Sequence, residues 1–137
     1  MARKEVVLKM LGRYEDQLVQ GILPRGVVSV LRQYVEAQER AERSYGRAAS
    51  SAERLFSAST LNTMRTFSVI GSSAGRETLR SINRAESVQR QPEYEIGVFA
   101  REHLLLKPDG VSLAPEDVEE NRRRIQDYRK QLESQMV

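Results

Sequence analysis

Apolar and small side chains recur every three or four residues between positions 27 and 55 of this chain. In order they are Val27, Leu31, Tyr34, Gln38, Ala41, Tyr45, Ala48, Ala52 and Leu55. Steps that alternate between three and four residues keep side chains on one side of an α-helix, so the pattern predicts one long helix with a continuous seam. Beyond Tyr34 the seam is mostly alanine, which buries little area and lets another helix approach closely. We therefore expect the seam to be an interface with a partner helix.

Two helices joined by a short turn are predicted at the N-terminal end. Val7, Leu11 and Leu18 share one face of a helix that runs from about residue 2 to residue 20. Gly21 fits the left-handed conformation that ends many helices, and Pro24 stands where a new helix can start. The second helix begins near residue 26 and reaches about residue 58. We expect the two helices to form an antiparallel hairpin.

The middle of the chain leaves helix and strand open at two places. Residues 57–70 keep a helical spacing of apolar side chains, but their threonines and β-branched residues also favour a strand. Residues 94–106 alternate enough for short strands and fit a helix almost as well. Between these segments, the Gly- and Ser-rich residues 71–75 predict a break in the chain, and residues 76–90 predict a basic helix.

A C-terminal amphipathic helix from Pro115 to about Gln135 is predicted by several signals that agree. Proline at the first helical position and acids in the first turn suit a helix start. The apolar face of this helix consists of Val118, Ile125, Tyr128 and Leu132. We expect that face to be a second interface with a partner.

The expected fold is mainly α and elongated. It comprises a helical hairpin with a long arm over residues 1–70, a hinge and basic helix over 71–91, an irregular acidic connector with room for short strands over 92–114, and the C-terminal helix over 115–137. Aromatic residues make up 6% of the 137 residues, and tryptophan is absent. So few large side chains fill a compact core poorly, and we expect neighbouring proteins to complete part of the apolar surface.

Charge alternates in blocks along the chain, although the formal net charge is only +3. Residues 61–91 carry five basic and two acidic side chains, whereas residues 92–121 carry two basic and eight acidic ones. Blocks of alternating sign suit docking on complementary protein surfaces. The candidates for electrostatic docking through carboxylates are Arg76, Arg80 and Arg84, spaced four residues apart, and the run Arg122, Arg123 and Arg124.

Sites for catalysis, cofactors or metals are not predicted. The chain has no cysteine, and its one histidine, His103, lacks the spacing of a His-Glu-x-x-His zinc site. Three residues separate Gly71 from Gly75 and no lysine follows, which departs from the phosphate-binding P-loop pattern. We therefore expect neither an enzyme nor a cofactor-binding protein.

Membrane spans and secretory signals are not predicted either. No apolar run approaches the roughly 20 residues that cross a bilayer, and Lys9 and Arg13 interrupt the apolar stretch near the start of the chain. Acidic residues in the first helix weaken its attraction to anionic lipid, so we do not expect it to lie on a membrane surface. We expect a protein that is not secreted and that lies inside a cell, or within a virion or an organellar complex.

Together these patterns favour a non-catalytic structural or adaptor subunit of a larger multiprotein assembly, of the kind found in virions or organellar complexes. It would act by coiled-coil-like docking of helices with other subunits, in a hetero- or homo-oligomer. The alternative is a small basic nucleic-acid-binding or packaging protein, because the pI is about 9.4 and the Arg76, Arg80 and Arg84 ridge fits phosphate contacts. Against the alternative, only Phe67 lies near the ridge as a base-stacking platform, and the acidic block would repel a polyanion.

Overall fold

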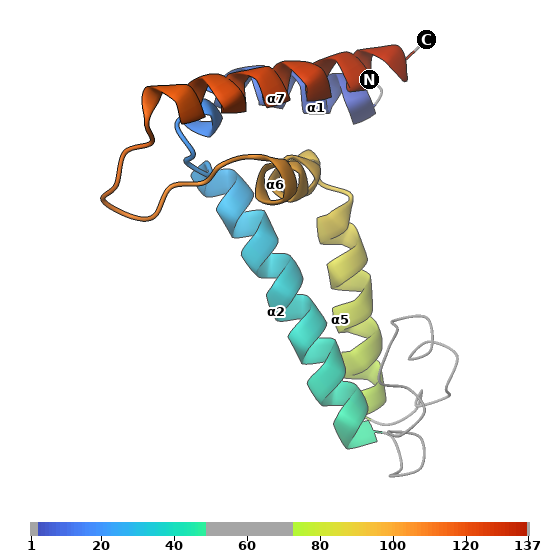
Figure 1. The fold of residues 1–137 in the computed structure, drawn as a ribbon. Helices are drawn as coiled ribbons and strands as arrows, with labels where there is room; N and C mark the ends of the chain where they lie inside the picture. The colour runs from blue at the N-terminus through green and yellow to red at the C-terminus, as the bar shows by residue number, and fades with distance from the viewer. Residues whose placement is uncertain (1–2, 49–72, 137) are drawn as a thin grey trace. The chain divides into compact units, whose positions relative to one another are not determined.

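The structure, a computed structural model, describes residues 3–48 and 73–136, without the side chains of residues 47, 48 and 74. In these ranges all regular structure is helical, which confirms the mainly α fold (Figure 1). The helices are α1 (Arg3–Val19), α2 (Arg25–Ala48), α5 (Ser73–Gln89), α6 (Pro92–His103) and α7 (Pro115–Ser134). The bounds predicted for the first and last helices match α1 and α7 to within one residue at each end.

The chain divides into two compact units. The first unit comprises residues 1–31 and 90–137, and the second comprises residues 32–89. Helix α2 therefore contributes its first two turns to the first unit and the rest of its length to the second. Since most of α2 lies in the other unit from α1, the antiparallel hairpin of the first two helices stays a prediction.

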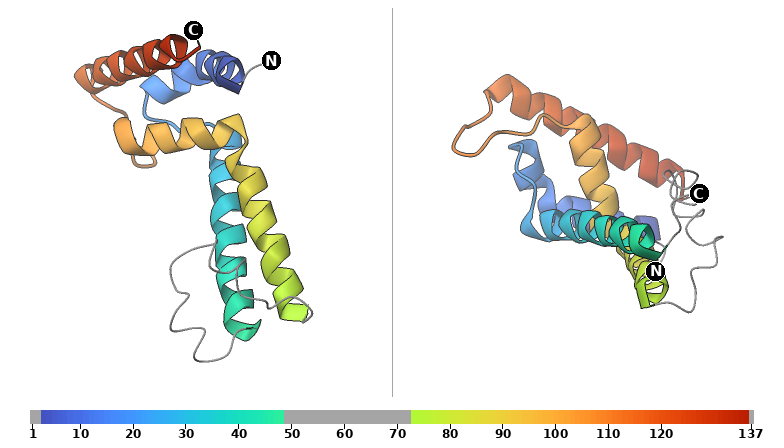
Figure 2. Two further views of the ribbon diagram at one scale, coloured as in Figure 1. Left: turned by 90° about the vertical axis from the view of Figure 1, so that its right-hand side faces the viewer. Right: turned by 90° about the horizontal axis from the view of Figure 1, so that it is seen from below.

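The first unit is built on α1, which lies antiparallel beside α7 and also packs against α6 (Figures 1 and 2). The pairing of α1 with α7 is marked by polar contacts of Lys4 with Gln135 and of Glu15 with Arg129. Inside lies one apolar core from four helices and the segment after α6: Val7, Leu11, Leu18, Val19, Val27, Leu31, Ile96, Phe99, Ala100, Leu104, Ile125 and Leu132.

Gly21 ends α1 as the sequence predicts. Its φ is +77°, a left-handed conformation that glycine adopts without a Cβ penalty. The amide of Gly21 donates to the carbonyl of Leu18, and that of Ile22 donates to the carbonyl of Gln17, both at 3.0 Å. This pair of hydrogen bonds is the Schellman motif, which satisfies carbonyls that the helix end leaves without partners.

The region around residues 94–106 is a helix over its first ten residues, so the strand interpretation and the irregular connector are wrong there. Pro92 occupies the first turn of α6, Glu93 and Glu95 stand in the same turn, and basic residues lie near the other end. These residues complement the helix dipole. The buried side of this segment also favours a helix, because Ile96, Phe99 and Ala100 enter the core at three- and four-residue spacing. Within the predicted connector, residues 92–114, only residues 104–114 are irregular.

The second unit consists, in its described part, of α2 from residue 32 onward and of α5, side by side and antiparallel (Figures 1 and 2). Arg84 contacts Gln33, and Gln89 contacts Tyr34, near one end of the pair, while Arg40 meets Glu77 further along. The buried side chains are mostly small: Ala37, Ala41, Ser44 and Tyr45 on α2, and Thr78, Ser81, Ile82, Ala85 and Val88 on α5.

Helix α5 begins at Ser73, three residues before the predicted start. The expected break at residues 71–75 is therefore wrong for Ser73, Ala74 and Gly75, which are helical. The rest of that break lies outside the described residues. So do the predicted extension of the second helix to residue 58 and the helix-or-strand alternative for residues 57–70.

Candidate functional site

The described part of the seam predicted on α2 is buried or half-buried within the chain. Val27 and Leu31 lie in the core of the first unit, while Ala41 and Tyr45 are buried in the second unit. Tyr34 is half-buried, and its hydroxyl accepts a hydrogen bond from Gln89 Nε2 at 3.3 Å. These side chains therefore stabilise the fold of the chain itself. The side chain of Ala48, together with Ala52 and Leu55, lies outside the described residues.

The apolar face of α7 is also used inside the chain. Ile125 and Leu132 are buried in the core of the first unit, and Val118 packs against it. Tyr128 stacks on Phe99 of α6, with ring centroids 4.0 Å apart and planes 8° from parallel. The face that the sequence suggests for a partner is thus the face that joins α7 to the chain's own core.

The hydroxyl of Tyr128 points at a carboxylate of α6. It donates to Glu95 Oε1 at 3.5 Å, and Glu95 also pairs with Arg3 of α1 at 3.4 Å. Burial raises the pKa of the Tyr128 phenol above its ordinary value, and the negative charge of Glu95 raises it further. This tyrosine therefore stays neutral and connects α6 to α7.

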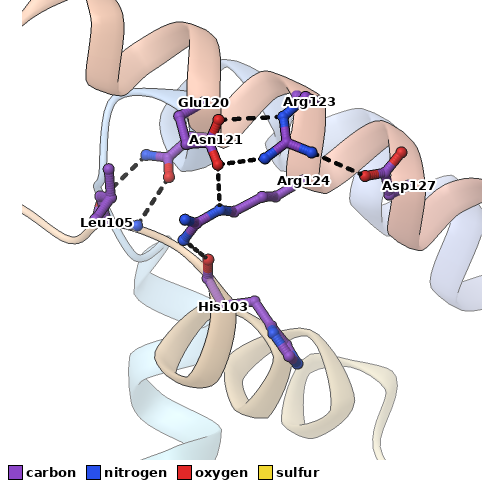
Figure 3. A network of polar contacts seen from close by, with 7 residues as sticks. All are labelled: His103, Leu105, Glu120, Asn121, Arg123, Arg124 and Asp127. Carbon is purple, nitrogen blue, oxygen red and sulfur yellow. Dashed lines mark hydrogen bonds and ion pairs between the residues drawn. The ribbon is translucent and has the colours of Figure 1, made fainter.

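The arginine run of α7 is paired with acids of the same helix, and Figure 3 shows these contacts for Arg123 and Arg124. Arg122 meets Glu119 at 3.4 Å, and Arg123 contacts both Glu120 and Asp127. The hydrogen bond from Arg123, and then that from Arg124, lower the pKa of Glu120. Because these charges balance one another locally, the run offers little net positive potential to a partner.

Arg124 has a further contact that the sequence does not reveal. Its Nη1 donates to the carbonyl oxygen of His103 at 2.6 Å, while its Nε donates to Glu120 at 2.9 Å (Figure 3). His103 is the last residue of α6, so the guanidinium caps a carbonyl at the negative end of that helix. Arg124 thus positions α6 against α7.

A buried polar residue that sequence reasoning missed, Asn121, holds the segment that follows α6. Its Oδ1 accepts from the amide of Leu105 at 2.8 Å, and its Nδ2 donates to the carbonyls of Leu105 at 3.0 Å and Val19 at 3.2 Å (Figure 3). The signal was present in the sequence, because Asn121 stands three residues after Val118 and four before Ile125 on the apolar side of α7.

The same segment is also fixed from the α1 side. The amide of Lys107 donates to the carbonyl of Gly21 at 3.0 Å. A Cβ on Gly21 would stand 2.8 Å from the carbonyl oxygen of Leu105, so only glycine permits this approach. Further on, Gly110 has φ +78° and the amide of Val111 donates to the carbonyl of Pro108, which closes a turn.

Residues 104–113, which we name the apolar loop, present large apolar side chains to solvent. The exposed fraction is 36% for Leu105 and 51% for Val111. Leu106 and Leu113 beside them are half-buried. Backbone hydrogen bonds and the buried amide of Asn121 hold this loop, and its exposed side chains include large apolar ones. The loop is therefore a candidate surface for a protein partner.

The predicted arginine ridge lies on the outer side of α5. Arg76, Arg80 and Arg84 are all exposed, and Nη2 of Arg84 donates to Gln33 Oε1 at 2.8 Å. Together with Asn83 and Ser87, which are exposed on the same side, they form what we name the α5 ridge. The acids of α5, Glu77 and Glu86, are half-buried at its flanks. The structure thus brings the three predicted arginines together on one face.

Neither the described residues nor the comparisons with known proteins identify a function for the chain. Among the described residues, no three His, Asp or Glu side chains are grouped to hold a metal ion, and no helix there is long and apolar enough to span a membrane. No protein-family model, curated protein or solved structure matches this chain.

Proposed function

We propose that the chain is a non-catalytic structural or adaptor subunit of a larger protein assembly, and that it docks on a protein partner through the apolar loop. The observation that supports this most directly is the exposure of Leu105 and Val111 on a loop whose backbone is held at Leu105 by Asn121 and at Lys107 by Gly21. The surface predicted from sequence, the seam of α2, is replaced in this proposal because its described residues are covered by the chain itself.

The energetics favour such a loop as a binding anchor. Full burial of a leucine or valine side chain contributes about 1.5 to 3 kcal/mol relative to leaving it in water. A loop that is already ordered loses less conformational entropy when it binds, so more of that free energy is retained as affinity. A few rigid apolar anchors of this kind carry most of the free energy in many protein interfaces.

The second unit supports the same role. Its described buried side chains are mainly alanine, serine and threonine, which remove little apolar area from water. Val35, on the part of α2 that belongs to this unit, is 43% exposed. A thin helical pair with an exposed valine gains stability when another protein covers it, as subunits of permanent assemblies do.

The test compares two neighbouring substitutions in the apolar loop. Val111→Asp places a charge at the most exposed apolar position, whereas Ser112→Asp places the same charge on an exposed polar neighbour. Each tagged variant is expressed in the cells that naturally make the chain, and co-purifying proteins are quantified by mass spectrometry. Circular dichroism checks that the variants keep their helical content.

We expect Val111→Asp to reduce the yield of a stoichiometric partner at least tenfold, and Ser112→Asp to leave it close to that of the unsubstituted chain. If Val111→Asp retains the same partners at the same yield, the apolar loop is not the docking surface and the proposal fails.

A further inference from the structure

The apolar loop is bordered by acidic side chains that have no partner in the described part of the chain. Asp109 lies in the loop itself, and Glu116 and Asp117 stand in the first turn of α7, into which the loop leads (Figure 1). No ion pair or hydrogen bond of these three carboxylates occurs among residues 3–48 and 73–136. We name the three residues the acidic border.

The acidic border lies close to the exposed apolar side chains. Asn121, whose side chain binds both backbone groups of Leu105, stands four residues after Asp117 on α7. Residues four apart in a helix share one side of it and are about 6 Å apart along its axis. Asp117 therefore lies beside the point at which Leu105 is held. Asp109 is two residues before Val111, so their Cα atoms are at most about 7 Å apart.

The charge beside the apolar loop is negative. Residues 104–118 contain three acids, which are the acidic border, and one base, Lys107. The positive end of the α7 dipole carries about half an elementary charge, so it offsets only part of the three negative charges. The next two acids, Glu119 and Glu120, differ because arginines of the same helix pair with them. Net negative charge therefore remains where the apolar side chains are exposed.

Several possible occupants of this surface fit it poorly. Nucleic acid and anionic lipid carry negative charge, so the acidic border repels them. A second copy that docked through the same loop would bring two acidic borders together, because a twofold interface uses the same patch of both copies. Like charges that face each other across an interface oppose binding. A basic protein surface meets none of these obstacles.

We infer that the apolar loop docks on a basic protein surface, whose apolar side chains receive Leu105 and Val111 while its lysines or arginines face the acidic border. This inference rests on the proposed function, since it specifies the charge of the partner that the apolar loop binds. The apolar side chains supply most of the affinity. The carboxylates speed association, make it dependent on salt and exclude acidic partners.

The experiment uses two labelled amphipathic peptides as probes of the partner's charge. Both repeat leucine at every third or fourth position, and the other positions carry lysine and serine in the basic peptide and glutamate and serine in the acidic peptide. Fluorescence anisotropy measures their binding to the full chain from about 0.01 to 1 M salt, over which the Debye length falls from about 30 to about 3 Å.

Three variants of the chain separate charge from apolar contact. The border variant combines Asp109→Asn with Glu116→Gln and so removes two exposed charges of the acidic border. The control variant combines Asp16→Asn with Glu133→Gln, which removes two exposed carboxylates elsewhere in the first unit that have no ion pair among the described residues. Val111→Ser removes an apolar side chain and keeps the charge. Circular dichroism checks that all three keep their helical content.

At about 0.01 M salt we expect the basic peptide to bind at least about ten times more tightly than the acidic peptide. The border variant weakens binding of the basic peptide by about three- to tenfold at this salt concentration and by much less at about 1 M salt. The control variant changes the affinity by less than about twofold. Val111→Ser weakens binding at every salt concentration and leaves the salt dependence unchanged.

Absence of binding by the basic peptide, equal binding of the two peptides, or equal losses in the border and control variants overturns the inference. In the last two cases the proposed function stands if Val111→Ser still weakens binding. An unchanged affinity of Val111→Ser for the basic peptide removes the loop as an anchor, so the proposed function then fails together with the inference. Self-association of the chain that Val111→Ser abolishes would assign the loop to a second copy, which also overturns the basic partner.

Discussion

The side-chain amide of Asn121 pairs with the backbone of Leu105 through both of its polar atoms, accepting from the amide at 2.8 Å and donating to the carbonyl at 3.0 Å. A primary amide carries the same kinds of donor and acceptor as a peptide group. Asn121 therefore forms with Leu105 the two hydrogen bonds that a neighbouring β-strand would form. The same Nδ2 also satisfies the carbonyl of Val19 at the end of α1. One side chain thus joins α1, α7 and the apolar loop.

Replacing Asn121 by alanine leaves three backbone groups without their partner in a buried place. Each buried polar group that loses its hydrogen bond costs about 1 to 3 kcal/mol, but water entering beside the loop offsets part of this. We expect Asn121→Ala to lower the free energy of unfolding by about 3 kcal/mol in urea denaturation. Gln126→Ala, at an exposed amide of the same helix, changes it by less than about 0.5 kcal/mol. Equal effects of the two substitutions would contradict a central role for Asn121.

We expect replacement of glycine by alanine to have opposite effects on stability at two helical positions, Gly12 and Gly97. Gly12 is exposed, and a Cβ built there meets nothing within 4 Å, so Gly12→Ala should stabilise the chain by up to about 1 kcal/mol through helix propensity. A Cβ on Gly97 stands 2.9 Å from Leu31, including its Cγ. Gly97→Ala therefore crowds the core of the first unit and should destabilise it by about 1 to 3 kcal/mol despite the same propensity gain. Thermal unfolding of both variants tests the pair, and a stabilised Gly97→Ala would show that Leu31 moves aside freely.

Tyr128 predicts how stability changes at alkaline pH. Its pKa is raised in the folded chain, first by burial and then by Glu95. Above the ordinary tyrosine pKa of about 10, the unfolded chain therefore loses this proton while the folded chain keeps it. The free energy of unfolding contributed by this group is fully present below about pH 10 and declines as the pH rises further.

Tyr128→Phe removes that contribution while keeping the ring that stacks on Phe99. Denaturation at about pH 8 and about pH 11 should show a smaller loss of stability for Tyr128→Phe than for the unsubstituted chain. The remaining tyrosines are common to both proteins, so the difference isolates Tyr128. The same pH dependence in both proteins would mean that the phenol ionises as readily in the folded state as in the unfolded state.

Arg124 and Arg122 are neighbours with different expected roles. Arg124 caps the carbonyl of His103, a position at which a cation gains about 0.3 to 1 kcal/mol from the helix dipole, whereas Arg122 only pairs with exposed Glu119. We expect Arg124→Gln to lower the free energy of unfolding by about that amount and to speed amide exchange at the end of α6. Arg122→Gln should leave both unchanged within error. If exchange in α6 is the same in the two variants, the contact with His103 does not hold the helix end.

The elements themselves could be predicted from the sequence because their signals are local. Gly21 ends α1 and Pro115 starts α7 through conformational preferences that act within a few residues. The helix α6 was the exception. Read alone, Tyr94 to Phe99 favour a helix almost as well as a strand. The choice was decided by the burial of Ile96, Phe99 and Ala100 in a shared core.

For the candidate sites, what the sequence predicts and what only the structure reveals are divided more sharply. The sequence alone placed Arg76, Arg80 and Arg84 on one helix face, because a spacing of four residues within a helix determines it. It did not reveal that the run Arg122 to Arg124 is neutralised by its own helix, nor that Asn121 holds Leu105 in the apolar loop.

By itself, then, the sequence determined the bounds of α1 and α7 and which side of each is apolar. Only the tertiary structure decided which apolar sides are covered. Ile125 and Leu132 lie in one core with residues of α1 and α6, and Ala41 and Tyr45 are buried in the unit that contains α5, so these faces serve the chain's own fold. The reason is physical: periodicity acts over one or two turns, whereas burial depends on pairings between residues that are far apart in the chain.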